Sequence, residues 1–329
     1  MDGAGSSYVQ ALIDAGQLPH FKKMQAEGAW TNNARCDYDI SVTLPNHICQ
    51  VTGRGVLGPA GHGWTSNGDP AAGQTLQSNK GSYVAGVFDV AHDNGLRTGL
   101  YTGKSKFALF DTSYNATHGE PDATGPDNGR DKIDEFVCEK SPKLVPALKA
   151  AMTGAAPFHY VLFHYAETDA AGHAFGWGSP AYNDAMKKMD AYLGQLFEMI
   201  AATPALKGKT AIILTADHGG AGRDHSDATK AIDYTIPFYV WGPGVQAGAD
   251  LYALNPATLA DPGTGRPDYQ AAKQPVRNGD AANLALRLLG LGTVPGSTIN
   301  GVRNVGAAAP ATQPLPAAAA LPPPRRRAA

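Results

Sequence analysis

The sequence predicts a doubly wound, three-layer α/β/α fold with a mostly parallel central sheet. Three short runs, at 158–165, 209–216 and 236–242, consist mainly of aliphatic and aromatic residues, as strands buried on both faces do. Between the first two lies the segment 179–202, in which apolar side chains recur at helical spacing. A strand, a helix and a second strand in this order are typical of a right-handed parallel crossover.

The other elements follow from helix caps, breakers and periodicity. Residues 41–53, SVTLPNHICQVTG, predict a helix, because Pro45 is tolerated in a first turn and Gly53 is a typical helix end. This helix places Thr43 at or beside its N-terminus. Further helices are expected at 7–15, 18–28 and 280–291, and an extended segment is expected at 29–36.

A chain of 329 residues fits one large α/β domain, which we place at residues 1–305. Two segments rich in turn-forming residues, at about 111–134 and 246–274, indicate loop insertions in this domain. Residues 306–329 are of low complexity and rich in proline and alanine. Such a segment cannot bury a core, and we expect it to be a disordered tail.

The composition, with 43% hydrophobic and 17% charged residues, is that of a soluble globular protein. A net charge of −2 indicates no broad basic surface for nucleic acid.

No apolar run reaches the ~18 to 20 residues that span a bilayer, and no signal-peptide pattern precedes residue 20. Three scattered cysteines exclude a disulfide framework and a cysteine-based zinc site. The oligomeric state stays open.

Acidic and histidine residues follow the predicted strands. Asp169 and His173 come after the first strand, Asp217 and His218 after the second, and His225 lies seven residues further on. Because loops at the carboxyl ends of parallel strands meet in one crevice, we expect these side chains to converge. Imidazoles and carboxylates without thiolates suit zinc, and less specifically manganese or iron. Five candidates exceed the three ligands of one catalytic zinc, so we expect two metal ions.

Paired metal ions serve in-line phosphoryl displacement, which needs a nucleophile. Thr43 is the candidate, because a metal ion that binds a hydroxyl oxygen lowers its pKa by several units. Free backbone N–H groups at the start of the predicted helix would also point at the transferred phosphoryl oxygens.

The motifs occur in a defined order along the chain. They are DG at 2–3, TLPNH at 43–47, GHGWTSN at 61–67, ETDAAGH at 167–173, TADHGG at 215–220, DHSD at 224–227 and IPFYVWGPGV at 236–245. This order resembles the alkaline phosphatase superfamily, and within it the type I phosphodiesterase and nucleotide pyrophosphatase family. The resemblance covers roughly residues 1–245 and the last predicted helix, and it implies an alkaline phosphatase-like fold.

The resemblance also implies roles for individual residues. One zinc ion would be bound by Asp169, His173 and His225. The second zinc ion would be bound by Asp2, Asp217, His218 and the oxygen of Thr43. Thr43 would attack phosphorus and form a phosphothreonine intermediate, and Asn67 would donate a hydrogen bond to a non-bridging phosphoryl oxygen.

Only Met1 precedes Asp2, whereas in the family this aspartate follows a central strand. We therefore expect the first strand and any signal peptide to be missing, through truncation or a misplaced start codon. The resemblance favours an extracytoplasmic location.

The expected substrates are phosphodiesters or nucleotide pyrophosphates, since Asn67 is present and no arginine is clearly aimed at a doubly charged phosphate, although Arg54 lies nearby in sequence. A phosphomonoesterase, a phosphonate hydrolase and a non-catalytic relative remain alternatives. Six further residues are expected to be packing or loop residues: His47, His62, Lys104, Lys106, His118 and His164.

Overall fold

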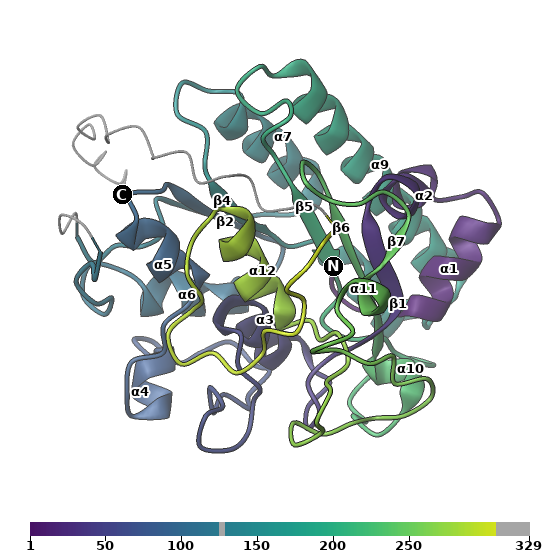
Figure 1. Ribbon diagram of the computed structural model, residues 1–329, viewed down its shortest axis with the longest axis horizontal. Coiled ribbons are helices and arrows are strands. Elements are labelled where there is room, and N and C mark those ends of the chain that lie inside the picture. The colour runs from purple at the N-terminus through teal and green to yellow at the C-terminus, as the bar shows by residue number, and fades with distance from the viewer. Residues whose placement is uncertain (125–128, 307–329) are drawn as a thin grey trace.

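The computed structural model describes residues 1–124 and 129–306. Strands lie at the centre of the molecule and helices lie on both sides of them, which confirms the predicted α/β class (Figure 1). The predicted tail at 306–329 lies outside the described residues, apart from Gly306. None of the helices in the described ranges combines the length and the apolar character that a membrane span requires.

The strands form two hydrogen-bonded groups, with the orders β5-β6-β1-β7 and β3-β2-β4. Their bounds are β1 Ala29–Arg35, β2 Thr98–Thr102, β3 Glu135–Cys138, β4 Tyr160–Phe163, β5 Ile212–Thr215, β6 Thr235–Trp241 and β7 Ala249–Asp250. The second group is parallel throughout, and β1 is parallel to β7. Strand β6 runs antiparallel to both β5 and β1. The three apolar runs predicted as strands are confirmed as β4, β5 and β6.

The first residues of the chain lie between the ends of β4 and β5. The Met1 ammonium group donates to the carbonyl of Thr215 at 2.9 Å, and the Asp2 N–H donates to the carbonyl of Tyr165 at 3.0 Å. The N–H of Asp217 in turn donates to the carbonyl of Met1 at 3.3 Å. Strands β4 and β5 therefore meet through residues 1–2, and the predicted crossover joins two groups of strands rather than two paired neighbours.

Helices cover both faces of the strands. One set comprises α1 (Ser6–Asp14), α2 (Pro19–Glu27), α7 (Ser141–Met152) and α9 (Pro180–Ala202), and the other comprises α3 (Thr43–Thr52), α5 (Val87–Asp93) and α12 (Asp280–Leu288). Helices α1 and α2 contact β1 and β6, α7 contacts β2 and α9, and α12 contacts α3, α5 and β5. Five predicted helices are confirmed as α1, α2, α3, α9 and α12. The last ends before Gly290, which has a φ of 74°.

Strand β2 shows how the two faces are divided. Its Leu100 packs with Ile48 of α3 and Phe88 of α5, whereas the next residue, Tyr101, packs with Leu144 of α7. Successive side chains of a strand point to opposite faces. The strand is therefore covered on both sides, as expected for a three-layer fold.

Shorter elements occupy the connections. They are α4 (Leu76–Lys80), a 3₁₀ turn (Ser105–Phe107), α6 (Ala108–Ser113), α8 (Glu167–Phe175), α10 (Ala231–Tyr234) and α11 (Leu251–Leu254). The predicted insertion at 246–274 contains β7 and α11, and its Leu251 and Leu259 are buried. In the segment 111–134, Lys132 is buried and its Nζ lies 2.9 Å from a carboxylate oxygen of Asp93. Both segments are thus attached to the domain.

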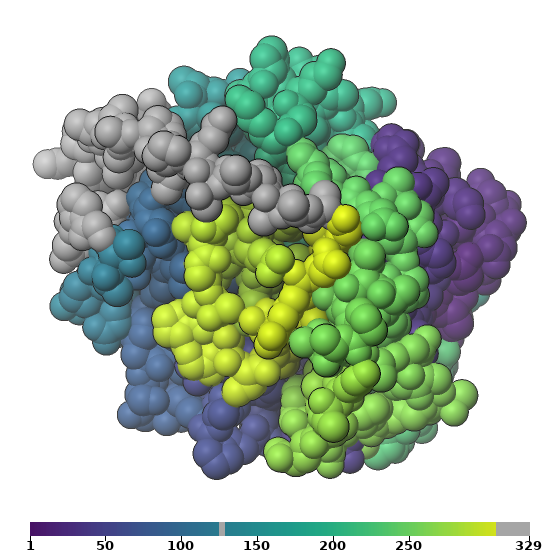
Figure 2. Space-filling view, viewed as in Figure 1, coloured from purple at the N-terminus to yellow at the C-terminus, as the bar shows by residue number. Residues whose placement is uncertain are grey.

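The end of the described chain crosses the front face of the molecule, between the segments coloured blue and green in Figure 2. A backbone hydrogen bond attaches this segment to the domain: the N–H of Gln246 donates to the carbonyl of Val305 at 2.7 Å. Val302 and Val305 contribute to the main hydrophobic core. This segment therefore covers the face on which α12 lies.

His62 makes the stability of this fold sensitive to acid. The ring is buried, its Nδ1 accepts from the N–H of Trp64 at 3.1 Å, and burial lowers its pKa to about 3. Below pH 6.5 the unfolded chain takes up a proton that folded His62 cannot hold until about pH 3, so this residue reduces stability as pH falls. We predict that His62→Asn, whose amide oxygen can replace Nδ1, loses less stability between pH 7.5 and pH 5.

The expected difference at pH 5 is on the order of 2 kcal/mol. Urea unfolding of both proteins at the two pH values measures it. Parallel losses in the wild type and the variant would contradict the assignment of a neutral, buried His62.

Candidate metal centre and active site

The structure brings all eight predicted site residues together. Asp2 lies at the N-terminus, Thr43 is the first residue of α3, and Asn67 lies in the loop before α4. The others follow strands: Asp169 and His173 on α8 after β4, Asp217 and His218 directly after β5, and His225 in the loop before α10. The convergence at strand ends that the sequence predicts is confirmed.

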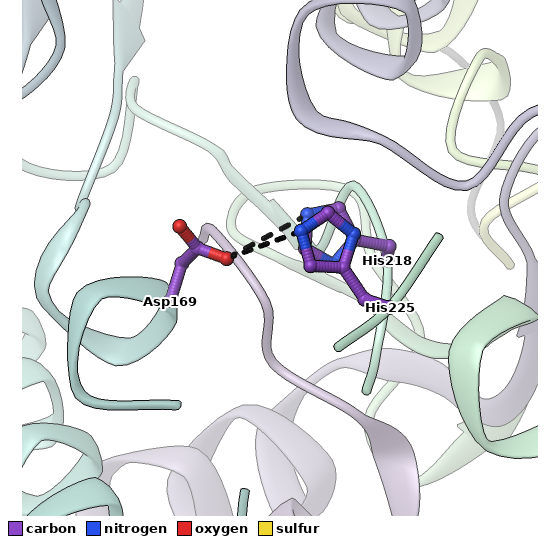
Figure 3. A group of neighbouring side chains, drawn as sticks. All are labelled: Asp169, His218 and His225. Carbon is purple, nitrogen blue, oxygen red and sulfur yellow. Dashed lines mark ion pairs between the residues drawn. The ribbon is translucent and has the colours of Figure 1, made fainter. Parts of the chain in front are cut away.

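Three side chains form the first group, namely Asp169, His218 and His225, whose ligand atoms lie within 4.8 Å of one another (Figure 3). Asp169 Oδ1 lies 3.7 Å from His225 Nε2 and 3.9 Å from His218 Nε2. His173 adds a fourth side chain to this group. Its Nε2 lies 3.4 Å from Asp169 Oδ1 and 3.1 Å from His225 Nε2. His173 is also the exposed member, since 47% of its side-chain surface is accessible.

Asp2, Asp217 and His218 form the second group, also within 4.8 Å. His218 therefore belongs to both groups and joins them. The Thr43 hydroxyl lies 3.4 Å from Asp2 Oδ1 and 3.4 Å from His218 Nε2. The predicted nucleophile thus faces the second group.

The three imidazoles are held in the form that binds metal. Their Nδ1 atoms lie 2.8 to 3.0 Å from the carbonyls of Gly219, Ser41 and Arg223. A carbonyl only accepts, so each Nδ1 carries the proton and each Nε2 lone pair faces the site. Burial lowers the pKa values of His218 and His225 to about 4, which keeps both rings neutral at pH 7. The two rings stack with centroids 3.6 Å apart.

Two buried carboxylate oxygens give a second test of whether metal ions fit here. Asp169 Oδ1 and Asp217 Oδ2 make no hydrogen bond within the described ranges. An unsatisfied buried carboxylate oxygen is costly, and a cation would remove that cost. Oxygen atoms without donors beside neutral Nε2 atoms therefore form a donor set that fits divalent metal ions.

The pKa values of Asp2 and Asp217 are shifted in opposite directions. Burial opposes ionisation of Asp2, but Lys104 and His164 hold its pKa well below the usual range. The pKa of Asp217 is raised well above the usual range by burial and by the neighbouring charge of Asp2. Without a metal ion, the second group therefore carries its negative charge on Asp2.

The sequence assigns four of the site's neighbours to packing or loop positions. The structure corrects this for Lys104, Lys106 and His164, and it shows His47 as a buried histidine that is bonded within its own helix, as expected. Lys104 Nζ lies 2.7 Å from both Asp2 Oδ2 and Asp169 Oδ2. His164 Nε2 lies 2.8 Å from Asp2 Oδ2, and His47 Nδ1 lies 2.9 Å from the carbonyl of Thr43. The fourth residue, Lys106, contacts Asn67, with Nζ 3.2 Å from Oδ1. Lys104 and Lys106 follow β2, a strand without a long aliphatic run, so the strand-end signal was missed.

Asn67 uses its amide oxygen within the protein. This oxygen accepts from the N–H of Leu44 at 2.9 Å, in the first turn of α3, as well as from Lys106. The contact fixes Asn67 beside Thr43. Because these contacts use the oxygen, the amide nitrogen is available to donate.

Close packing explains the glycines after His218. A Cβ on Gly219 would lie 2.1 Å from the carbonyl oxygen of Ile232, and one on Gly220 would lie 2.4 Å from the Trp177 ring. Only Gly222 in this loop has a left-handed φ, at 58°. The glycines therefore let neighbouring segments approach, and the turn that returns the chain to His225 needs glycine conformation at Gly222.

We predict that Gly220→Ala displaces Trp177, whose ring lies against His173 with centroids 5.1 Å apart, and so disturbs the first group. The variant should lose stability by about 1 to 3 kcal/mol and bind less metal per chain. Thermal unfolding and elemental analysis measure both. Gly292→Ala is the control, because its Cβ would meet nothing within 4 Å. Equal metal content in both variants would refute the packing role.

Known structures share this fold. Murine ectonucleotide pyrophosphatase/phosphodiesterase 5, in an inactive form in complex with AMP, superimposes with a TM-score of 0.58 at 15% sequence identity, covering 90% of this chain and 94% of the other. A protein in the alkaline phosphatase superfamily from Vibrio parahaemolyticus superimposes with a TM-score of 0.53 at 16% identity, covering 90% of this chain and 66% of the other. At these identities the likeness concerns the fold.

Sequence comparison points to the same group of proteins. GPI ethanolamine phosphate transferase 1 of Mus musculus is 28% identical over 151 residues, which are 44% of this chain and 16% of that protein. The chain thus matches about one sixth of this relative's length. The sequence model of the family described as type I phosphodiesterase / nucleotide pyrophosphatase matches residues 1–234, which include all eight predicted site residues. The chain therefore belongs to the type I phosphodiesterase / nucleotide pyrophosphatase family.

Proposed function

We propose that this protein hydrolyses phosphodiesters or nucleotide pyrophosphates at a two-metal site, with Thr43 as the nucleophile. The observation that carries the proposal is the position of the Thr43 hydroxyl, 3.4 Å from both Asp2 Oδ1 and His218 Nε2 at the start of α3. A hydroxyl beside metal-ligating atoms and a helix N-terminus is suited to attack a phosphoryl group.

In the proposed mechanism, Asp169, His173 and His225 would hold one divalent ion, and Asp2, Thr43, Asp217 and His218 would hold the other. We propose zinc for both. When bound, these ions would lower the pKa of the nucleophile and neutralise charge on the phosphoryl oxygens. The rings of His218 and His225 need no deprotonation to bind metal at pH 7, because burial lowers their pKa values to about 4.

Thr43 Oγ1 would form a bond to phosphorus while the bond to the leaving-group oxygen breaks, which gives an alcohol or nucleotide product and a phosphothreonine that retains the other ester group of the substrate. Water then attacks phosphorus and releases Thr43 and the phosphate product. Asn67, fixed through the N–H of Leu44, would donate from its amide nitrogen to a non-bridging oxygen. The N-terminal end of α3 adds a positive potential at the same position.

A second candidate is hydrolysis of phosphomonoesters or phosphonates. It is favoured by Lys104 and Lys106, whose ammonium groups lie at Asp2 and Asn67 and would attract a doubly charged substrate. Arg54 gives it no support, since its guanidinium donates to the carbonyl of Pro295 at 2.9 Å. A non-catalytic relative is less well supported, because backbone hydrogen bonds with Tyr165 and Asp217 hold Asp2 and Met1 in place. An extracytoplasmic location remains a proposal that rests on family resemblance.

Thr43→Ala tests the nucleophile. We predict a loss of at least roughly 10³-fold in the hydrolysis of bis-p-nitrophenyl phosphate, with metal content per chain retained, because the other six proposed ligands stay in place. Thr43→Ser keeps a hydroxyl and should retain measurable turnover. Rates and elemental analysis on identically purified proteins measure both effects. Equal turnover of the alanine variant and the wild type would exclude Thr43 as nucleophile.

Paired substrates decide between the two candidates. We predict that the wild type cleaves bis-p-nitrophenyl phosphate with a higher kcat/KM than p-nitrophenyl phosphate, since Asn67 offers one neutral donor and the Arg54 guanidinium donates to the carbonyl of Pro295. Chelation should abolish both reactions, and added zinc should restore them. A preference for the monoester, or for a phosphonate with a carboxylate, would instead establish the second candidate.

A further inference from the structure

We propose that Lys104 is an internal counter-cation, which keeps the two metal-binding groups assembled when no metal is bound and becomes redundant once metal binds. The proposal rests on the metal site of the proposed function. Lys104 Nζ contacts one carboxylate of each group, at 2.7 Å from Asp2 Oδ2 and 2.7 Å from Asp169 Oδ2. A single ammonium group thus bridges the two groups.

The two oxygens of each carboxylate have different neighbours. The Oδ2 atoms face Lys104, whereas Asp2 Oδ1 faces Thr43 and His218, and Asp169 Oδ1 faces His173, His218 and His225. Lys104 therefore occupies the Oδ2 atoms, while Asp169 Oδ1 has no hydrogen-bond donor in the described ranges and Asp2 Oδ1 accepts from the Thr43 hydroxyl. The ammonium group orients the carboxylates without filling the space between them and the imidazoles.

The charges around the site make Lys104 the cation on which both carboxylates depend. In the described part of the chain, the other ion-pair partners of Asp2 and Asp169 are imidazoles. Lys104 is thus the one lysine or arginine in the described ranges that forms an ion pair with either carboxylate. The Met1 ammonium group donates to Thr215 instead.

Local structure directs Lys104 to this place. Gly103 follows β2, and a Cβ on it would lie 2.7 Å from the Cβ of Ala166, in the turn between β4 and α8. The glycine lets the two loops approach. The N–H of Lys104 donates to the hydroxyl of Thr102 at 3.1 Å, and 20% of the Lys104 side chain is accessible. The long side chain is therefore held largely within the protein.

Loss of the ammonium group should destabilise the folded protein more when no metal is bound than when metal is bound. Removing one partner of a buried ion pair leaves an uncompensated charge, which is strongly destabilising. Bound divalent ions would supply that compensation themselves, so the metal-loaded protein should suffer less. By thermodynamic linkage, removal of Lys104 then increases the stabilisation that metal provides.

The test compares Lys104→Met, which keeps length and removes charge, with Lys106→Met as the matched control on the same loop. Melting temperatures are measured with chelator and with excess zinc. With chelator, we expect the melting temperature of Lys104→Met to lie about 5 °C or more below that of the control. On adding zinc, we expect the melting temperature of Lys104→Met to rise more than that of the control, by a similar amount. Lys104→Arg, which keeps the charge, should resemble the wild type.

Equal melting temperatures of the two methionine variants with chelator, or a smaller rise with zinc in Lys104→Met, would overturn the proposal. If Lys104→Met folds only when zinc is present, the proposal is supported; if it folds in neither condition, the proposal fails. A wild type that gains no stability from zinc would refute the two-metal function. In that case the comparison with chelator still decides whether Lys104 is the counter-cation.

Discussion

Three carboxylates buried in one site are the constraint on which the rest of the structure depends. Asp2, Asp169 and Asp217 are each at most 4% exposed. Burial of like charges is expensive, and the surroundings reduce this cost in two ways. Lys104 compensates Asp2 and Asp169, while the pKa of Asp217 is raised so that it can hold a proton. The two oxygens without a donor in the described ranges, Asp169 Oδ1 and Asp217 Oδ2, both lie near the imidazole of His218.

The fold supplies this arrangement by bringing the N-terminal residues and the ends of two strands to one place. Residues 1–2 are hydrogen-bonded between the ends of β4 and β5, so Asp2 stands between the loops that carry Asp169 and Asp217. Helix α3 begins at Thr43 on the same side, and the C-terminal segment covers it through α12 (Figures 1 and 2). The site therefore depends on contacts between parts of the chain that are far apart in sequence.

The sequence was most informative where chemistry coincides with strong local patterns. Aliphatic runs that end in Asp and His predicted β4, β5 and the residues beyond them, and Pro45 and Gly53 predicted the bounds of α3. The antiparallel direction of β6 could not be predicted, because a short apolar run carries no information on direction. Lys104 and His164 were missed because each acts on Asp2, more than 100 residues away, and nothing local to either residue indicates that contact. The metal ligands themselves came from the family resemblance as well as from spacing.

The hydrogen bonds from the three imidazoles to backbone carbonyls have a consequence for how the site tolerates sequence change. Gly219, Ser41 and Arg223 each contribute a carbonyl, and the side chains of Ser41 and Arg223 take no part in those bonds. Every amino acid provides the same acceptor. The tautomers of His218, His225 and His173 are thus encoded in the path of the main chain. A substitution at Arg223 leaves them unaltered as long as that path is preserved, whereas Gly219 has no room for a Cβ and the Ser41 hydroxyl donates to the carbonyl of His225.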